Sequence, residues 1–154
     1  MTVVLGIDPG CSGALVLVTE QGGYIDHLAM PTIKVGTKSR VNGAAVAAWV
    51  RQYGITHAYL EQVGAMPGQG TASMFTFGHA AGVAEGLLHG LNIPYTLVTP
   101  QAWKKSAGLI GSDKDAARSR AIQLYPELRA LDAKAKGQAI ADALLIARFG
   151  IGVK

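Results

Sequence analysis

The feature that most constrains the fold is an apolar, β-branched run near the N-terminus, Val3 to Asp8, which Pro9 and Gly10 end abruptly. Such a run is typical of a buried strand, and Pro-Gly predicts a turn directly after it. A carboxylate at the end of a core strand is costly unless a partner compensates its charge. Asp8 therefore either caps a turn or holds a metal ion at the edge of a sheet.

The segments that follow are arranged as in an α/β domain. Short turns between the first three expected strands predict antiparallel neighbours, and two βα crossovers predict two parallel additions. Residues 31–41 are expected to form an irregular loop. The expected strands are 3–8, 14–19, 24–30, 55–61 and 93–98, and the expected helices are 43–53, 73–90, 101–108, 112–124 and 138–150. The sequence thus predicts a mixed five-stranded sheet flanked by helices, in one domain over residues 1–154.

Composition limits the class of protein. Apolar residues make up 49% of the 154 residues and charged residues 16%, which excludes a disordered chain. The net charge of +4 is compatible with a polyanionic partner. Cys11 is the only cysteine, so no intrachain disulfide forms and a reducing compartment fits. No secretory signal and no apolar run of about 18 residues is present, so we expect an intracellular protein without membrane contact.

Two further acids resemble Asp8 in their setting. Glu61 ends the expected strand 55–61, and Asp142 interrupts the apolar helix 138–150. If the strands that end at Asp8 and Glu61 are parallel neighbours, these acids lie side by side, and the last helix can bring Asp142 to them. A divalent cation would relieve their repulsion, and oxygen ligands suit Mg²⁺ or Mn²⁺. Two such ions, about 3.5–4 Å apart, can clamp both oxygens of an in-line phosphoryl displacement.

Basic residues gather in loops and on polar helix faces, where they fit a phosphate backbone. The segment 31–41 is either a solvated loop or an arm that contacts phosphates, and the Gly-rich loop 64–73 is either a mobile linker or a ligand probe. The candidate nucleic-acid contacts are Lys34, Lys38, Arg40, Met66, Lys104, Lys105, Lys114, Arg118, Lys134 and Lys136.

One face of the expected helix 73–90 consists of small residues, Gly78, Ala81, Gly82 and Gly86. Glycine inside a helix costs up to about 1 kcal/mol relative to alanine, so this face predicts a closely packed partner. That partner is either the sheet or a second subunit. Phe75 and Phe77, near the start of this helix, are expected to be packing residues.

Five motifs in order resemble the RuvC family of Holliday junction resolvases, which have the RNase H-like fold. The motifs are LGIDPG at 5–10, LEQV at 60–63, GHAAGVAEGLL at 78–88, QAWKKSAGLIGSDK at 101–114 and ADALLIA at 141–147. GIDPG alone is only moderately specific, whereas the set is highly specific and covers nearly the whole chain.

The resemblance implies a homodimer that binds four-way DNA junctions and nicks two strands symmetrically, leaving 5′-phosphate and 3′-hydroxyl ends. Asp8, Glu61 and Asp142 match metal-binding acids of the family, which implies two Mg²⁺ ions per site, with Mn²⁺ as a substitute. Lys104 or Lys105 matches a basic position near the scissile phosphate, and Lys114 a further basic position. The implied location is the cytoplasm of a bacterial cell or of a phage-infected host.

The sequence departs from the family pattern at two places. The family usually has Asp or His three positions before the last acid, where this chain has Ala139; Gln138 could offer a carbonyl oxygen on nearly the same helix face. The family's aromatic wedge, a few residues after the EQ pair, is replaced by Gly64, for which Met66 or Phe75 could substitute. These departures and the compact length resemble the phage-encoded branch of the family.

Three functions therefore compete. The first is a metal-dependent structure-specific endonuclease in which Lys104 or Lys105 neutralises charge on the phosphate. The second is a catalytically weak junction-binding protein, which the alanine at position 139 favours. The third is a nucleotide-phosphate binder of the actin and sugar-kinase type, which needs two such domains where this chain has room for one.

Overall fold

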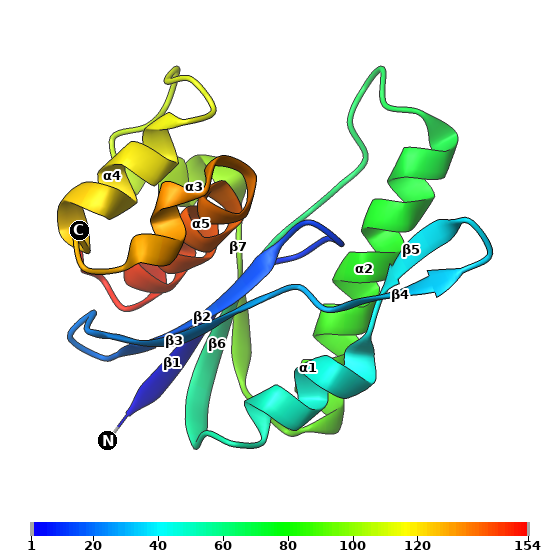
Figure 1. The fold of residues 1–154 in the computed structure, drawn as a ribbon, viewed down its shortest axis with the longest axis horizontal. Coiled ribbons are helices and arrows are strands. Elements are labelled where there is room, and N and C mark those ends of the chain that lie inside the picture. The colour runs from blue at the N-terminus through cyan, green and yellow to red at the C-terminus, as the bar shows by residue number, and fades with distance from the viewer. Residues whose placement is uncertain (1, 154) are drawn as a thin grey trace.

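The computed structural model describes residues 2–153 and contains a five-stranded mixed sheet (Figure 1). Its strands, in spatial order, are β3 (Tyr24–Ala29), β2 (Ala14–Thr19), β1 (Val3–Asp8), β6 (Ile55–Glu61) and β7 (Tyr95–Val98). The pairs β1–β2 and β2–β3 are antiparallel, whereas β1–β6 and β6–β7 are parallel. The predicted α/β class and mixed sheet are confirmed.

Helices cover both faces of this sheet (Figure 1). One face packs against α1 (Gly43–Val50) and α2 (Thr71–Gly90), and the other against α3 (Pro100–Ser106), α4 (Ala116–Leu124) and α5 (Lys134–Gly150). A short 3₁₀ helix, η1 (Arg129–Asp132), precedes α5. Successive side chains of a strand point to opposite faces, so the central strands β1 and β2 contribute buried residues to two apolar cores. Across residues 2–153, every helix is too short or too polar to span a lipid bilayer.

The helix starts follow local capping chemistry. The side chain of Asn42 accepts a hydrogen bond from the Ala45 N–H at 3.2 Å and so caps α1. Thr99 accepts from the Ala102 N–H at 3.2 Å, and Pro100 occupies the first turn of α3. Both caps satisfy a backbone donor that the helix leaves free, which explains why the expected starts at residues 43 and 101 lie within one residue of the observed ones.

The expectation of an irregular loop at residues 31–41 is wrong. These residues form a two-stranded antiparallel sheet of β4 (Thr32–Val35) and β5 (Lys38–Val41), with Gly36 at φ +65° in the turn. Ile33 and Val35 alternate with Thr32 and Lys34 along β4, and this alternation is typical of a strand, although all four residues are exposed. Lys34, Lys38 and Arg40 lie in the same segment and made this strand pattern difficult to recognise in the sequence.

Several other boundaries also differ from expectation. The last helix begins at Lys134, four residues early, and α4 begins at Ala116, four residues after the expected start. The strand β7 begins at Tyr95 instead of residue 93. Phe77 is half-buried, whereas Phe75 is 63% exposed, so the expectation that Phe75 is a packing residue is wrong. The ring of Phe75 instead lies 5.6 Å from the Arg40 guanidinium.

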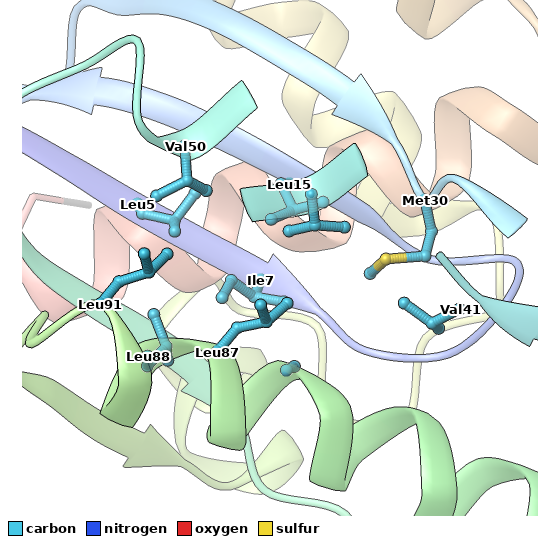
Figure 2. A pocket seen from close by; sticks show the side chains of 11 residues that line it. Leu5, Ile7, Leu15, Met30, Val41, Val50, Leu87, Leu88 and Leu91 are labelled. Carbon is cyan, nitrogen blue, oxygen red and sulfur yellow. The ribbon is translucent and has the colours of Figure 1, made fainter. Parts of the chain in front are cut away.

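A small cavity lies inside the core between the sheet and α1 and α2 (Figure 2). Its lining is entirely apolar and includes Leu5, Leu15 and Leu88. The cavity volume of about 20 Å³ is close to the minimum that one water molecule needs. Because no polar group lines it, this cavity is a packing gap and not a ligand site.

Candidate active site

The acids that end β1 and β6 lie next to each other on the sheet. Ile7 pairs with Leu60 in the parallel register, so Asp8 and Glu61 are the next residues on adjacent strands. Ile7 and Leu60 both belong to the core under α1 and α2. By alternation, Asp8 and Glu61 therefore point to the opposite face, toward α5. The predicted juxtaposition of these two acids agrees with the observed register.

The third acid comes from α5, which lies directly on β1. A Cβ atom added at Gly6 would meet the Ala143 carbonyl oxygen at 2.2 Å and the Ala147 Cβ at 2.8 Å. Only glycine allows the strand and the helix to approach this closely. Asp142 precedes Ala143 on that helix, so the same approach brings its carboxyl group to the end of the sheet.

The turn after β1 is equally tight. A Cβ atom at Gly13 would lie 1.9 Å from the Asp8 carbonyl oxygen, and the Gly13 N–H donates to the Gly10 carbonyl at 3.0 Å. This turn ends β1 at Asp8 and starts β2 six residues later, at Ala14. Asp8 thus occupies a fixed position at the rim of the sheet instead of the end of a flexible loop.

The three carboxyl groups share one electrostatic environment. Burial, and then the charge of Glu61, raise the pKa of Asp142 to about 7. Burial, and then the charges of Asp142 and Glu61, raise the pKa of Asp8 well above its ordinary value. Burial likewise raises the pKa of Glu61. Buried carboxyl groups whose charges raise the pKa of a neighbouring acid in this way favour a bound cation.

Two side chains of α3, those of Lys104 and Trp103, act against this rise in pKa. The charge of Lys104 lowers the pKa of all three acids, and the indole N–H of Trp103 donates to Glu61 Oε2 at 2.7 Å. Trp103 is 1% exposed, and the Lys104 Nζ lies 5.5 Å from the centre of its ring. The sequence prediction missed Trp103, although it stands next to the two lysines in the 101–114 motif.

The α3 lysines differ in position. Both are exposed, but the charge of Lys104 acts on all three acids, whereas no such interaction involves Lys105. Of the two alternatives that the sequence left open, the effect of its charge on the pKa values of the acids favours Lys104. Ala139 is buried in the core and brings no donor atom, while Gln138 is half-buried and lines a cavity together with Asp142.

The donor atoms of the three acids suit a metal ion by their chemistry, although they do not form a preassembled metal site. Within residues 2–153, no three acidic, histidine or cysteine side chains lie close enough together to form a ready-made metal site. The nearby donors are oxygen atoms, which suit Mg²⁺ or Mn²⁺. The raised carboxylate pKa values indicate unsatisfied negative charge at this place. The acids therefore fit a hard dication that draws them together.

The remaining basic candidates fall into different surroundings. Lys114 lines the cavity beside Asp142, whereas Lys134 and Lys136 are exposed in the first turn of α5. Arg118 bonds Asp115 through two nitrogens and the backbone oxygens of η1 through a third, so its guanidinium is engaged within the protein. The DNA contact of Arg118 stays a prediction, and the observed bonds of its guanidinium join the start of α4 to η1.

The β4–β5 hairpin separates its cations onto two faces. Ile33 pairs with Arg40 and Val35 with Lys38, so these four side chains share one face. Lys38 also lines a hollow with Cys11 and Phe77, near the turn that follows Asp8. On the other face, the Lys34 Nζ donates to the Ser39 hydroxyl at 3.2 Å.

Met66 is the most exposed candidate that is not charged. It lies in the Gly-rich segment between β6 and α2 and is 66% exposed. This segment follows Glu61 directly, so Met66 is connected to the acids through a short stretch of chain.

Comparisons with known proteins agree with this arrangement. The family model described as crossover junction endodeoxyribonuclease RuvC matches residues 4–149. The chloroplastic Holliday junction resolvase MOC1 of Chlamydomonas reinhardtii is 32% identical over 97 residues, which are 62% of this chain and 11% of that protein. The chain thus spans about a tenth of the length of this curated relative.

Two solved structures of Thermus thermophilus RuvC share the fold. The structure in complex with a Holliday junction substrate has a TM-score of 0.56 at 16% identity, and a further RuvC structure has 0.58 at 18%. Each comparison covers 96% of this chain and 92% of the other. The similarity confirms the predicted RNase H-like fold.

Proposed function

Because the chain belongs to the RuvC family of crossover junction endodeoxyribonucleases, we propose that it cleaves four-way DNA junctions by paired, symmetric nicks. The observation that carries this proposal is the placement of the three acids: the parallel register sets Asp8 beside Glu61, and the close approach of α5 to Gly6 brings Asp142 to the same end of the sheet. Residues 1–154 act as one nuclease domain, and each nick leaves a 5′-phosphate and a 3′-hydroxyl.

The three acids would hold two Mg²⁺ ions, or Mn²⁺, which when bound supply charge neutralisation and an activated water for in-line hydrolysis. Asp8 and Glu61 would bind from the strand ends, and Asp142 would bind from α5. The Gln138 carbonyl oxygen is a further candidate ligand in place of the donor that Ala139 lacks. Lys104 neutralises charge that develops on the phosphate, and Trp103 fixes the carboxylate orientation of Glu61 through its hydrogen bond.

The decisive experiment compares end-labelled four-way junction with linear duplex of the same sequence. We expect paired nicks in the junction alone, with both Mg²⁺ and Mn²⁺, and products that a DNA ligase can reseal. Glu61→Gln should abolish the nicks while junction binding persists, whereas the matched change Glu127→Gln, at an exposed position, should cleave as the wild type does. Equal cutting of duplex and junction, or normal cutting by Glu61→Gln, would refute the proposal.

A catalytically weak junction-binding protein is the second candidate. Ala139 brings no donor, and the described acids do not form a preassembled metal site. This candidate predicts tight junction binding with no nicks in either metal. The same labelled junction therefore separates the two functions, since binding is common to both and cleavage is not.

We further propose that the active form is a homodimer that uses the small-residue face of α2. Gly78, Gly82 and Gly86 recur every fourth residue, are exposed, and have no atom within 4 Å of the position a Cβ would take. A helix packed there could approach closely, which supports a second copy as the partner. Light scattering after size-exclusion chromatography should give a dimer for the wild type and a monomer for Gly82→Leu; a monomeric wild type would contradict the proposal.

A further inference from the structure

The loop between α3 and α4 carries a second cation close to the acids. Lys114 lies near the end of this loop and lines, together with Lys104, a cavity of about 220 Å³ that Asp142 also lines. Two cations from different elements, α3 and the loop, therefore border the space next to this acid. A cation stabilises charge that develops on a phosphate only if it is held in the right place before the reaction.

The loop contains two flexible points. Residues 107–115 include Gly108 at φ +74° and Gly111 at φ +79°, and no atom of the described residues lies within 4 Å of the position that a Cβ would take at either glycine. Glycine adopts such angles at little cost, and it adopts many others as well. The position of Lys114 therefore depends on what fixes the other end of the loop.

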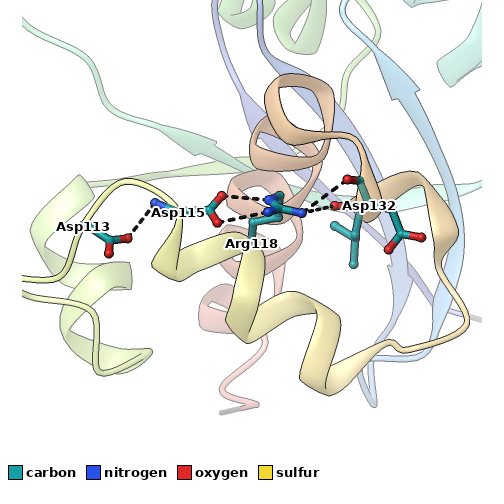
Figure 3. Close-up of polar contacts among 5 residues, drawn as sticks. Asp113, Asp115, Arg118 and Asp132 are labelled. Carbon is teal, nitrogen blue, oxygen red and sulfur yellow. Dashed lines mark hydrogen bonds and ion pairs between the residues drawn. The ribbon is translucent and has the colours of Figure 1, made fainter.

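That end is fixed by Asp115 and Arg118 (Figure 3). The Nε and Nη2 of Arg118 donate to the two carboxylate oxygens of Asp115 at 2.8 and 3.0 Å. Its Nη1 donates to the Leu131 carbonyl oxygen in η1 at 3.1 Å. The Asp115 N–H in turn donates to Asp113 Oδ1 at 2.9 Å, so the residues on both sides of Lys114 are tied to each other.

The carboxylate of Asp115 serves this pair and not the helix that follows. Asp115 is the N-cap residue of α4, a position at which Asp often accepts a hydrogen bond from a backbone N–H; within the described part of the chain its side chain makes no such bond. Both of its oxygens instead accept from Arg118, whose side chain is 18% exposed. These hydrogen bonds lower the pKa of Asp115, so the pair is ionised at neutral pH. A planar fork of this kind fixes direction as well as distance.

The element that Arg118 reaches leads directly into α5, which brings Asp142 to the other acids. The helix η1 ends at Asp132, and α5 begins at Lys134. The guanidinium thus connects the loop that carries Lys114 to the segment that carries Asp142. The distance between this lysine and this acid therefore depends on the Asp115–Arg118 pair.

We propose that Asp115 and Arg118 are positioning residues for cleavage, which hold Lys114 beside Asp142 so that its ammonium group meets the substrate phosphate. The proposal rests on the proposed nuclease function and adds to it two residues that act through a third. Loss of the pair should slow the cleavage step and leave junction affinity unchanged. The direct DNA contact predicted for Arg118 has the opposite consequence, since its loss would weaken binding.

The first test compares junction cleavage by Asp115→Ala and Arg118→Met with that of the wild type. Each change should lower kcat by roughly 10- to 100-fold with KM unchanged, and the double variant should be no slower, because both changes break the same pair. Arg129→Met is the matched control: Arg129 forms the same i,i+3 pair with Asp132 at 2.7 Å but is 84% exposed, so this variant should cleave normally. Normal cleavage by Asp115→Ala would overturn the proposal, whereas no cleavage by the wild type would refute the nuclease function itself.

The second test asks whether the pair acts through Lys114. In a Lys114→Met background, neither Asp115→Ala nor Arg118→Met should slow cleavage further, since the cation that the pair holds is already absent. A damaged fold would slow cleavage in that background as well, and a direct DNA contact would make Arg118→Met lower the salt dependence of junction binding by about one phosphate contact. Either result would overturn the proposal.

Hydrogen exchange provides a measurement that needs neither DNA nor metal. The backbone amides of residues 108–116 should exchange roughly 10-fold faster in Asp115→Ala and in Arg118→Met than in the wild type, because the loop has lost its fixed end. The amides of α5 should exchange at the wild-type rate in both variants. Loop amides that keep the wild-type rate, or an equal acceleration in α5, would overturn the proposal.

Discussion

Replacing Asp142 by Asn should stabilise the metal-free protein at neutral and alkaline pH. The carboxyl pKa rises from the ordinary 3.8 to about 7, chiefly because of burial and then because of the charge of Glu61. The folded state therefore holds this proton more tightly than the unfolded state does. Between about pH 4 and pH 7 the folded protein binds more protons, so its stability falls as the pH rises and then levels off above pH 7.

The size of this effect follows from the change in pKa. At about 1.36 kcal/mol per pH unit, a change from 3.8 to about 7 corresponds to about 4 kcal/mol. Asp142 is half-buried, and solvent screening reduces this figure to about 2–4 kcal/mol. For a chain of this length the difference amounts to a melting temperature roughly 5–15 °C higher for Asp142→Asn at pH 8.

Thermal melts in a chelator at pH 4, 6 and 8 provide the assay. The advantage of Asp142→Asn should be small at pH 4 and complete at pH 8, and Mg²⁺ or Mn²⁺ should raise the wild-type melting temperature more than that of the variant. The matched change Asp132→Asn removes an exposed acid paired with Arg129, and should alter stability by less than about 1 kcal/mol. The reasoning would be refuted if Asp142→Asn were no more stable than the wild type at pH 8, or if its advantage did not depend on pH.

Three further changes test the surroundings of the acids. Trp103→Phe removes the indole donor to the β6 glutamate, so metal affinity should fall roughly 10-fold and the acid limb of the pH–rate profile should move to higher pH. Lys104→Met should slow junction cleavage by roughly 100-fold, whereas Lys105→Met, from the exposed neighbour, should cost much less. Lys38→Ala should lower the salt dependence of junction binding by about one phosphate contact, measured by titration at several salt concentrations, and Lys34→Ala should change it less.

The sequence located the acids because their positions follow from local rules. An apolar run that ends in a carboxylate places that group at a sheet edge, and parallel pairing of two such runs aligns Asp8 with Glu61. Asp142 was recognisable because a carboxylate interrupts an otherwise apolar helix. These signals depend on residues close together in the chain, or on a pairing that the βα crossovers made predictable.

The missed features depend on contacts between distant parts of the chain. The bond from Trp103 to Glu61 joins residues 42 apart, and nothing in the local pattern distinguishes this indole from an ordinary core residue. Arg118 carried the charge of a DNA contact, but its partners at η1 become visible only when the chain is folded. The β4–β5 hairpin was not predicted because its sequence signal is weak: its short strands contain as many cations as apolar side chains.

The absence of a side chain at Gly6 limits which substitutions the enzyme can tolerate at this position. Distances between the acids depend on how far α5 stands from β1, and at this point main chain meets main chain. A variant with one methyl group at position 6 would keep every carboxylate and every charge, yet its helix would be displaced outward together with Asp142. All the side chains of the site would then be present, but the acids would stand too far apart for the cations that we propose they share.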